Sequence, residues 1–298
     1  MEIIVPQQVT PAKLTSSNVP ETDAPAWSSV TNYHPPDQVI YDHRVYECLL
    51  NNTNLTPTAG VLTDPPHWLD LGATNRYKMF DQVISTQTAR TGTIEVGIDP
   101  GTFVNAIAFF GLAGTEISVS MTDPVEGLVY DETRSLQDNT LIDSWYSYFF
   151  EEITYRSDMV FADLPNYMDG TLSFTIDAGL SQAKCGEVVM GRQKKIGVAN
   201  FGTGVSIQDY SRKDRDAFGN TIITPRAFSK RADYDVTIET KYAASVQKTL
   251  AELRTTPTVY VGDPNRPETV VYGFFKSFTI VLSNPSISEC SIDVEGLV

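Results

Sequence analysis

The feature that most constrains the fold is a series of short segments that alternate apolar and polar residues and end at turn signals. Four follow one another between residues 92 and 133, separated by Asp-Pro or Ala-Gly pairs, and two more lie at residues 170–177 and 185–191. Alternation with a period of two places every second side chain on one face of a strand. The sequence therefore predicts a mainly β chain in which residues 73–195 form a β-sandwich of the jelly-roll type.

The last third of the chain, residues 196–298, combines strands with one amphipathic helix. Residues 233–240, 270–282 and 290–296 have the composition of strands, whereas residues 243–254 carry apolar side chains at helical spacing. A single helix between strands is expected to cover one face of a sheet. This part is predicted to be an α+β domain that is mainly β.

Two smaller parts precede the sandwich. Residues 1–26 begin with a candidate edge strand at residues 2–5 and continue with a stretch rich in Pro, Ser and Thr that cannot build its own core. We interpret this part as an extended arm lying over another surface, for which a neighbouring subunit is one candidate; a frayed terminus is the alternative. Residues 27–72, with Trp27 at the start and Trp68 near the end, are predicted to form a small antiparallel module.

Charge and composition exclude several classes of function. The chain of 298 residues carries a formal net charge of −15, and its acids are scattered. Such a surface repels phosphate backbones and anionic lipids, so we expect no nucleic-acid partner. There is no run of about 18 apolar residues, so we expect no membrane insertion. Three cysteines and no secretory signal favour buried thiols in a chain that folds in a reducing cytoplasm.

Sequence motifs for catalysis and metal binding are missing. His34, His43 and His67 match no known spacing of metal ligands, and neither a GxSxG elbow nor a phosphate-binding loop occurs. We therefore expect no catalytic residue, no metal and no cofactor. Asp163, Asn166 and Asp169 leave one alternative open, a calcium ion bound in a loop of the sandwich.

Two stretches are candidates for contacts between subunits. Residues 143–150 contain five aromatic residues, more than one sheet face can hide, and residues 208–231 place basic side chains among scattered acids. Mixed charges suit ion pairs across an interface, whereas a solvated hairpin is the alternative reading of the basic stretch. The candidate interface residues are Trp145, Tyr146, Tyr148, Arg212, Lys213, Arg226, Lys230 and Arg231.

The small module carries a pattern of rings around a turn predicted at Asp42-His43. The pattern consists of Trp27, Tyr33, Asp37, Val39, Tyr41, Tyr46 and Trp68. It resembles the small chitin-binding modules attached to polysaccharide hydrolases, although Pro36 replaces their usual glycine. The resemblance implies a saccharide site at Tyr33, Tyr41 and Trp68, because aromatic faces stack on sugar C–H groups. A role in the core alone is the open alternative, since so small a sheet needs its aromatics for packing.

The order of these parts resembles a group of virion proteins. The stretches TNRYKMFD, DYSRKDRDAFGN and RAFSKR, and the segment VVYGFFKSFTIVLSNPSISECSIDVEGL at residues 270–297, carry the likeness. They resemble baseplate or tail-tip proteins of long-tailed bacteriophages. The resemblance implies a structural, non-enzymatic subunit of the virion tail, assembled in the host cytoplasm. Its partners would be copies of itself in a symmetric ring or hub, other phage tail proteins and a host cell-surface glycan.

Two other classes of function stay open at this point. A polysaccharide-degrading enzyme would need paired carboxylates, for which Glu151, Glu152, Asp163 and Asp169 are the candidates. A lectin-like adhesin would use the aromatic module alone and would need no other tail protein.

Overall fold

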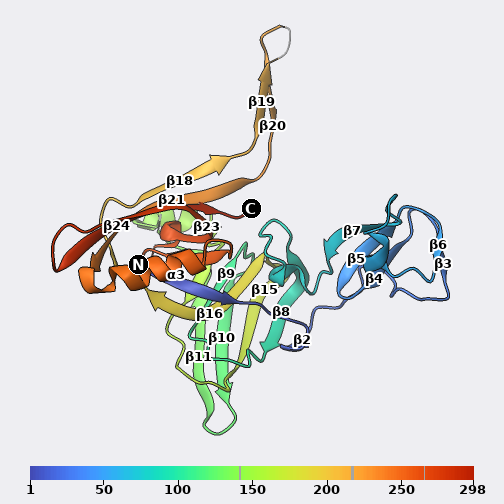
Figure 1. The fold of residues 1–298 in the computed structure, drawn as a ribbon, viewed down its shortest axis with the longest axis horizontal. Coiled ribbons are helices and arrows are strands. Elements are labelled where there is room, and N and C mark those ends of the chain that lie inside the picture. The colour runs from blue at the N-terminus through green and yellow to red at the C-terminus, as the bar shows by residue number, and fades with distance from the viewer. Residues whose placement is uncertain (141, 216–217, 265) are drawn as a thin grey trace.

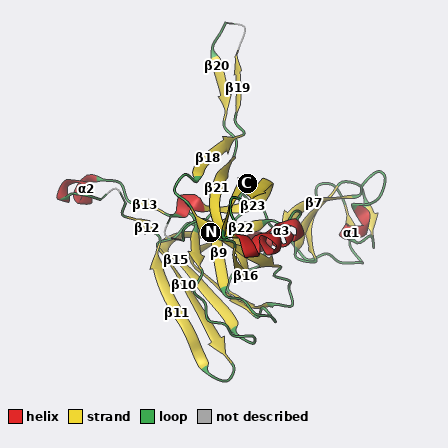
Figure 2. Cartoon of the chain, turned by 60° about the vertical axis from the view of Figure 1, so that its left-hand side comes forward, coloured by secondary structure: helices red, strands yellow, loops and turns green. Residues whose placement is uncertain are grey.

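The computed structural model describes residues 1–140, 142–215, 218–264 and 266–298. The fold is mainly β and antiparallel, as the sequence predicts. In the described ranges the longest helix is α3 (Ala243–Glu252), the helix expected near residues 243–254. Figure 1 shows a central body from which a small module and a long hairpin project, and Figure 2 shows a further arm that ends in helix α2 (Trp145–Phe150).

The largest sheet has ten strands in the order β14-β9-β16-β1-β22-β23-β24-β21-β17, with β18 also paired to β21. Its strands are β14 (Met159–Phe161), β9 (Ala106–Phe110), β16 (Glu187–Lys195), β1 (Glu2–Gln7), β22 (Thr258–Val261), β23 (Val270–Val281), β24 (Ile287–Gly296), β21 (Phe228–Glu239), β17 (Val198–Ala199) and β18 (Gly204–Asp209). All of these pairings are antiparallel.

A second sheet packs against the β9 and β16 end of the first and completes a sandwich. Its order is β11-β10-β15-β8-β2, formed by β11 (Gly127–Ser135), β10 (Glu116–Asp123), β15 (Thr171–Cys185), β8 (Thr88–Ile98) and β2 (Leu14–Ser17). Ile94, Ile117 and Ile176 of this sheet share one buried core with Phe109 and Met190 of the large sheet. The segments with alternating apolar residues therefore form strands of the two sheets, and their apolar faces pack against each other in this core.

Strand β1 is central, which corrects the expectation of an edge strand at residues 2–5. It pairs with β16 on one side and β22 on the other, with Ile3 opposite both Lys194 and Tyr260. Ile3 and Ile4 are fully buried in different cores. The surface on which residues 1–26 lie is thus the chain's own body, and β1 joins residues 73–195 to residues 196–298 in one sheet.

Helix α3 covers one face of the C-terminal strands. Its Val246 and Leu250, with Leu253 just beyond its end, pack in the same core as Tyr234 and Ile292 of the sheet. This apolar stripe follows the helical spacing that the sequence predicts. No helix in the described ranges is both long enough and apolar enough to span a membrane.

The large sheet curls into a half-barrel. Phe110 of β9 stacks on Tyr272 of β23 with ring centroids 5.5 Å apart, although three strands separate β9 from β23 in the sheet. Lys230 of β21 forms an ion pair with Asp158, which immediately precedes β14, so opposite ends of the sheet are joined. The face that carries Ile4 becomes the lining of this half-barrel.

The small module and the projecting arms are built from short elements. The module contains β3 (Asn32–Tyr33), β4 (Gln38–Tyr41), β5 (Arg44–Cys48), β6 (Asn52–Thr53), α1 (Pro57–Gly60) and β7 (Trp68–Ala73). The arms contain β12 (Gln137–Asp138) with β13 (Thr154–Tyr155), and β19 (Arg212–Arg215) with β20 (Thr221–Thr224). The described ranges also contain the 3-10 helices η1 (Lys78–Phe80), η2 (Thr240–Tyr242) and η3 (Pro267–Thr269). The predicted turn at Asp42-His43 is confirmed, since both residues have positive φ between β4 and β5.

Candidate functional site

Two of the three rings proposed to face a saccharide form the core of the small module. Trp68 is 1% exposed and Tyr33 is 5% exposed, and their rings meet edge to face at 5.2 Å. The indole Nε1 of Trp68 donates to the carbonyl of Leu55 at 3.2 Å, and the hydroxyl of Tyr33 accepts from the amide of Ser28 at 2.7 Å. The sequence left two roles open for Tyr33 and Trp68, sugar binding and core packing, and the structure supports core packing. A module with so few short strands needs both rings to exclude water from its core.

Tyr41 is the remaining candidate for a sugar contact. It is only partly buried and packs edge to face on Trp27, with ring centroids 5.4 Å apart. These two partly exposed rings lie side by side at the edge of the module's core. Saccharide binding by the module stays a prediction, now narrowed to this pair.

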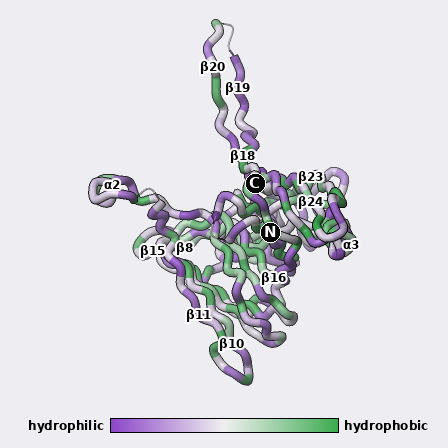
Figure 3. Tube along the Cα trace, turned by 90° about the vertical axis from the view of Figure 1, so that its left-hand side faces the viewer, coloured by the Kyte–Doolittle hydropathy of each residue, from purple (hydrophilic) through white to green (hydrophobic). Residues whose placement is uncertain are grey.

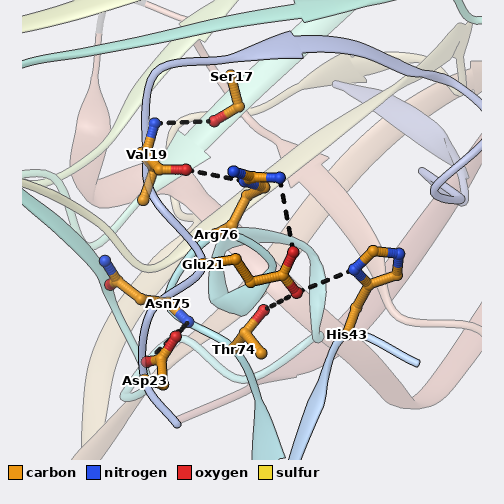
Figure 4. A network of polar contacts seen from close by, with 8 residues as sticks. All are labelled: Ser17, Val19, Glu21, Asp23, His43, Thr74, Asn75 and Arg76. Carbon is orange, nitrogen blue, oxygen red and sulfur yellow. Dashed lines mark hydrogen bonds and ion pairs between the residues drawn. The ribbon is translucent and has the colours of Figure 1, made fainter. Parts of the chain in front are cut away.

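A polar network attaches the module to the body, as Figure 4 shows. The carboxylate of Glu21 accepts a hydrogen bond from Thr74 Oγ1 at 2.8 Å and lies 2.9 Å from His43 Nδ1. Arg76 lies 3.5 Å from the same carboxylate and donates through Nε to the carbonyl of Val19 at 2.8 Å. One carboxylate thus joins the turn of the module, the segment after β7 and the linker before the module.

Helix α2 presents its aromatic side chains to solvent at the tip of an arm (Figure 2). Ser144 and Ser147 form a reciprocal capping box, which starts the helix although aromatic residues are modest helix formers. Trp145 is 80% exposed, and Tyr146 and Tyr148 are 72% and 62% exposed. The rings of α2 contact one another: Trp145 stacks on Phe149 with ring centroids 6.4 Å apart, and Tyr146 lies against Phe150. The helix therefore carries an apolar surface that its own body does not cover.

The long hairpin carries charges that are largely paired within it. Arg212 lies 2.5 Å from Asp214, and Lys213 lies 3.1 Å from Asp209. Arg226 is exposed, and no ion pair is found for it in the described part of the chain. Along the strands Ile222 and Ile223 are more than half exposed, so the hairpin is apolar as well as charged (Figure 3).

Lys230 and Arg231 differ from the other basic candidates because they pair within the body. Lys230 pairs with Asp158, and Arg231 lies 2.8 Å from Asp293 of the neighbouring strand β24. Both side chains are partly buried. Lys230 joins the two ends of the curled sheet, Arg231 joins two neighbouring strands, and a place for either at a subunit interface stays a prediction.

A cavity of about 260 Å³ lies inside the curl of the large sheet. Its walls include Ile84, Phe110, Tyr272, Phe228, Lys230 and Leu297. Phe228 is 56% exposed, so the cavity reaches the surface beside β21. Sequence reasoning missed this cavity because its walls come from segments far apart along the chain.

A buried acid lies near the stacked rings of this half-barrel. Glu187 of β16 is 4% exposed and is paired in the sheet with Phe110. Burial raises its pKa to about 9, although the amide of Gln82 donates to its Oε2 at 2.9 Å and the nearby Asp81 raises the pKa further. Glu187 is therefore protonated at neutral pH. The signal in the sequence was an acid inside the apolar run CGEVVMG.

The acids considered for glycoside hydrolysis lie on different elements. Glu151 and Glu152 are exposed beyond the end of α2, whereas Asp163 accepts a hydrogen bond from Tyr130 at 2.9 Å on the sandwich. Asp169 lies in the loop before β15. In the described ranges, no group of three or more His, Cys, Asp or Glu side chains is arranged to hold a metal ion.

Comparisons with known proteins give little further guidance. No protein-family model matches the chain, and no curated protein matches it. Among solved structures, it is similar to chitosan-binding module 1 of a chitosanase/glucanase from Paenibacillus sp. IK-5, with 8% identity and a TM-score of 0.26, over 38% of this chain and 81% of that one. A similarity at this level carries no argument about function.

Proposed function

We propose that the chain is a non-enzymatic structural subunit that assembles with copies of itself. Its type would be the baseplate or tail-tip protein of long-tailed bacteriophages that the sequence resembles. The observation that carries the proposal is helix α2, whose five aromatic side chains are each more than 60% exposed at the end of a thin arm.

An exposed aromatic cluster of this kind is costly for a free protein. Contiguous apolar patches on soluble monomers are small, and larger ones mark surfaces that contact a partner. Burying one aromatic side chain contributes roughly 1.5–3 kcal/mol relative to leaving it exposed. Covering α2 would therefore favour association.

The other projections support the same proposal. The hairpin β19–β20 extends far from the body and exposes Ile222 and Ile223, so it can reach a neighbouring subunit (Figure 1). Extended hairpins bridge subunits by pairing or packing on a neighbour's sheet, and closed symmetry repeats each contact. In this proposal the subunits form a ring or hub within the virion tail.

The small module would face outward and touch the host cell-surface glycan. A shallow site at Trp27 and Tyr41 would bind a sugar weakly, with a dissociation constant on the order of millimolar. Several copies in one ring would raise the overall affinity by roughly a hundredfold or more. Weak, repeated contacts suit reversible attachment.

Two measurements test the proposal. Imaging of intact phage particles with this chain labelled should locate it in the tail, and light scattering of the purified chain should show a mass that increases with concentration. A chain that stays monomeric alone and with tail proteins would contradict the proposal. Turnover of chitin or envelope glycans by the purified chain would contradict its non-enzymatic part.

A further inference from the structure

We propose that helix α2 of one copy inserts an aromatic side chain into the cavity of the curled sheet in a second copy. The inference rests on the proposed function, because it names the contact through which copies would assemble. It pairs two features of the same chain, an uncovered apolar helix and an open apolar cavity.

The size of the cavity suits an aromatic ring. A cavity of about 150 Å³ lined by Leu, Ile and Phe binds benzene. The cavity here has a volume of about 260 Å³ and is bounded by Phe110 and Tyr272. Aromatic pairs prefer stacked or edge-to-face contact, and Phe228, which is 56% exposed in the same wall, offers such a contact to a Trp or Tyr ring.

The helix is directed away from the cavity of its own chain. The arm starts where the amide of Arg156 donates to the carbonyl of Leu136, next to Ser157 in the cavity wall. From that point it extends outward, and α2 lies at its far end (Figure 2). The cavity that α2 would enter is therefore that of another copy.

The charges around the two surfaces are complementary. Asp143 precedes α2, and Glu151 and Glu152 follow it, and all three acids are exposed. Arg226 is exposed next to Ala227, which lines the cavity. The carboxylate of Asp158 in the wall is paired with Lys230, and Arg226 places a positive charge beside the cavity, whose lining also includes Val298.

The exposed rings of α2 set the area that the contact can bury. The ring that enters the cavity supplies about 150–250 Å², and all five rings together set an upper bound near the 800 Å² per partner of a standard interface. Because helix and cavity are different surfaces, the contact is heterologous and repeats from copy to copy, closing into a ring when the rotation permits.

The experiment mixes two variants of the full chain. In the first, Trp145→Ser with Phe149→Ser removes the stacked pair of rings from α2. In the second, Ser85→Trp fills the cavity from an exposed position in its wall. Leu180→Ser is the matched control, because Leu180 is 100% exposed elsewhere on the body. Light scattering follows mass, and circular dichroism verifies the fold.

We expect each variant alone to associate about 30-fold or more weakly than the wild type, since hot-spot rings dominate such contacts. An equimolar mixture should form complexes of two chains, because the intact arm of the second variant enters the intact cavity of the first. The control should associate like the wild type.

Other outcomes separate the inference from the proposed function. Unchanged association of the Ser85→Trp variant would overturn the inference and leave the proposal of a self-assembling subunit intact. Two weakened variants that do not form mixed dimers would overturn the pairing of arm with cavity. A wild type that never associates would overturn both.

Discussion

At the scale of residues, Glu187 makes the stability of the fold depend on pH. Its pKa is about 9 in the folded chain, compared with 4.5 for an ordinary Glu. Between these values the folded chain keeps a proton that the unfolded chain releases. The stabilising effect of this proton is complete below pH 4.5 and is lost as the pH rises towards 9.

We expect Glu187→Gln to remove this dependence. In the wild type the free energy of unfolding should fall by up to about 1.4 kcal/mol per pH unit across this range because of Glu187. Urea unfolding at pH 5, 7 and 9 measures the free energy of unfolding of each variant. Glu116→Gln, at an exposed acid, is the control. Equal slopes in the wild type and the Glu187→Gln variant would disprove the role of this carboxyl group.

Trp68, which the sequence offered for either binding or packing, lies buried in the core of the small module. We expect Trp68→Ala to destabilise the small module by about 3–5 kcal/mol, because a large buried side chain leaves a cavity. The buried thiol of Cys48, opposite Trp68 in the sheet, should then react with a thiol reagent. Trp145→Ala, on an exposed ring, is the control. Continued protection of Cys48 in the Trp68→Ala variant would argue against a packing role.

At the scale of elements, the alternation of apolar and polar residues predicts where strands lie, but it does not predict which strands pair. The segments expected at residues 92–98 and 170–177 lie in β8 and β15. Strand β1 was misjudged as an edge, although the consecutive apolar residues of EIIV already indicate burial on both faces. Partner strands lie far along the chain, and sequence alone does not identify them.

The candidate interface residues also divide into those that the local sequence identifies and those whose contacts lie far along the chain. The local sequence was enough to find the aromatic cluster at residues 145–150. It did not predict that the cluster forms a helix, because the helix starts with capping contacts between Ser144 and Ser147. The partners of Lys230 and Arg231 lie 72 and 62 residues away. The Lys230 pair depends on how the sheet curls and the Arg231 pair on which strands are neighbours, so no local pattern predicts them.

The central position of β1 can be tested with Ile4→Ala. We expect a loss of about 2–5 kcal/mol, because Ile4 is fully buried between β16 and β22. Val30→Ala, at an 87% exposed position, should change stability by less than about 0.5 kcal/mol. Chemical denaturation measures both, and a similar small effect in the two variants would contradict a central β1.

At the scale of the whole molecule, the chain is a compact body with three projections that differ in how they are held. The small module is joined to the body by the Glu21 network (Figure 4), whereas the long hairpin and the α2 arm project from the body (Figures 1 and 2). This arrangement predicts that the module is separable from the body at its linker.

We expect Glu21→Gln to loosen that attachment while the body stays intact. Hydrogen bonds to charged groups contribute about 1.5–3 kcal/mol each, so the linker should open and be cleaved by protease at least about tenfold faster. Limited proteolysis with mass spectrometry locates the cut near residues 19–26. Cleavage at the wild-type rate would mean that other contacts hold the module.

The central position of β1 also imposes an order on synthesis. Strand β1 has its partners in β16 and β22, which are translated much later than β1 itself. Until those strands emerge, the half-barrel does not exist. The cavity inside the half-barrel therefore forms late in folding, because it depends on strand pairings between residues that are far apart in the chain.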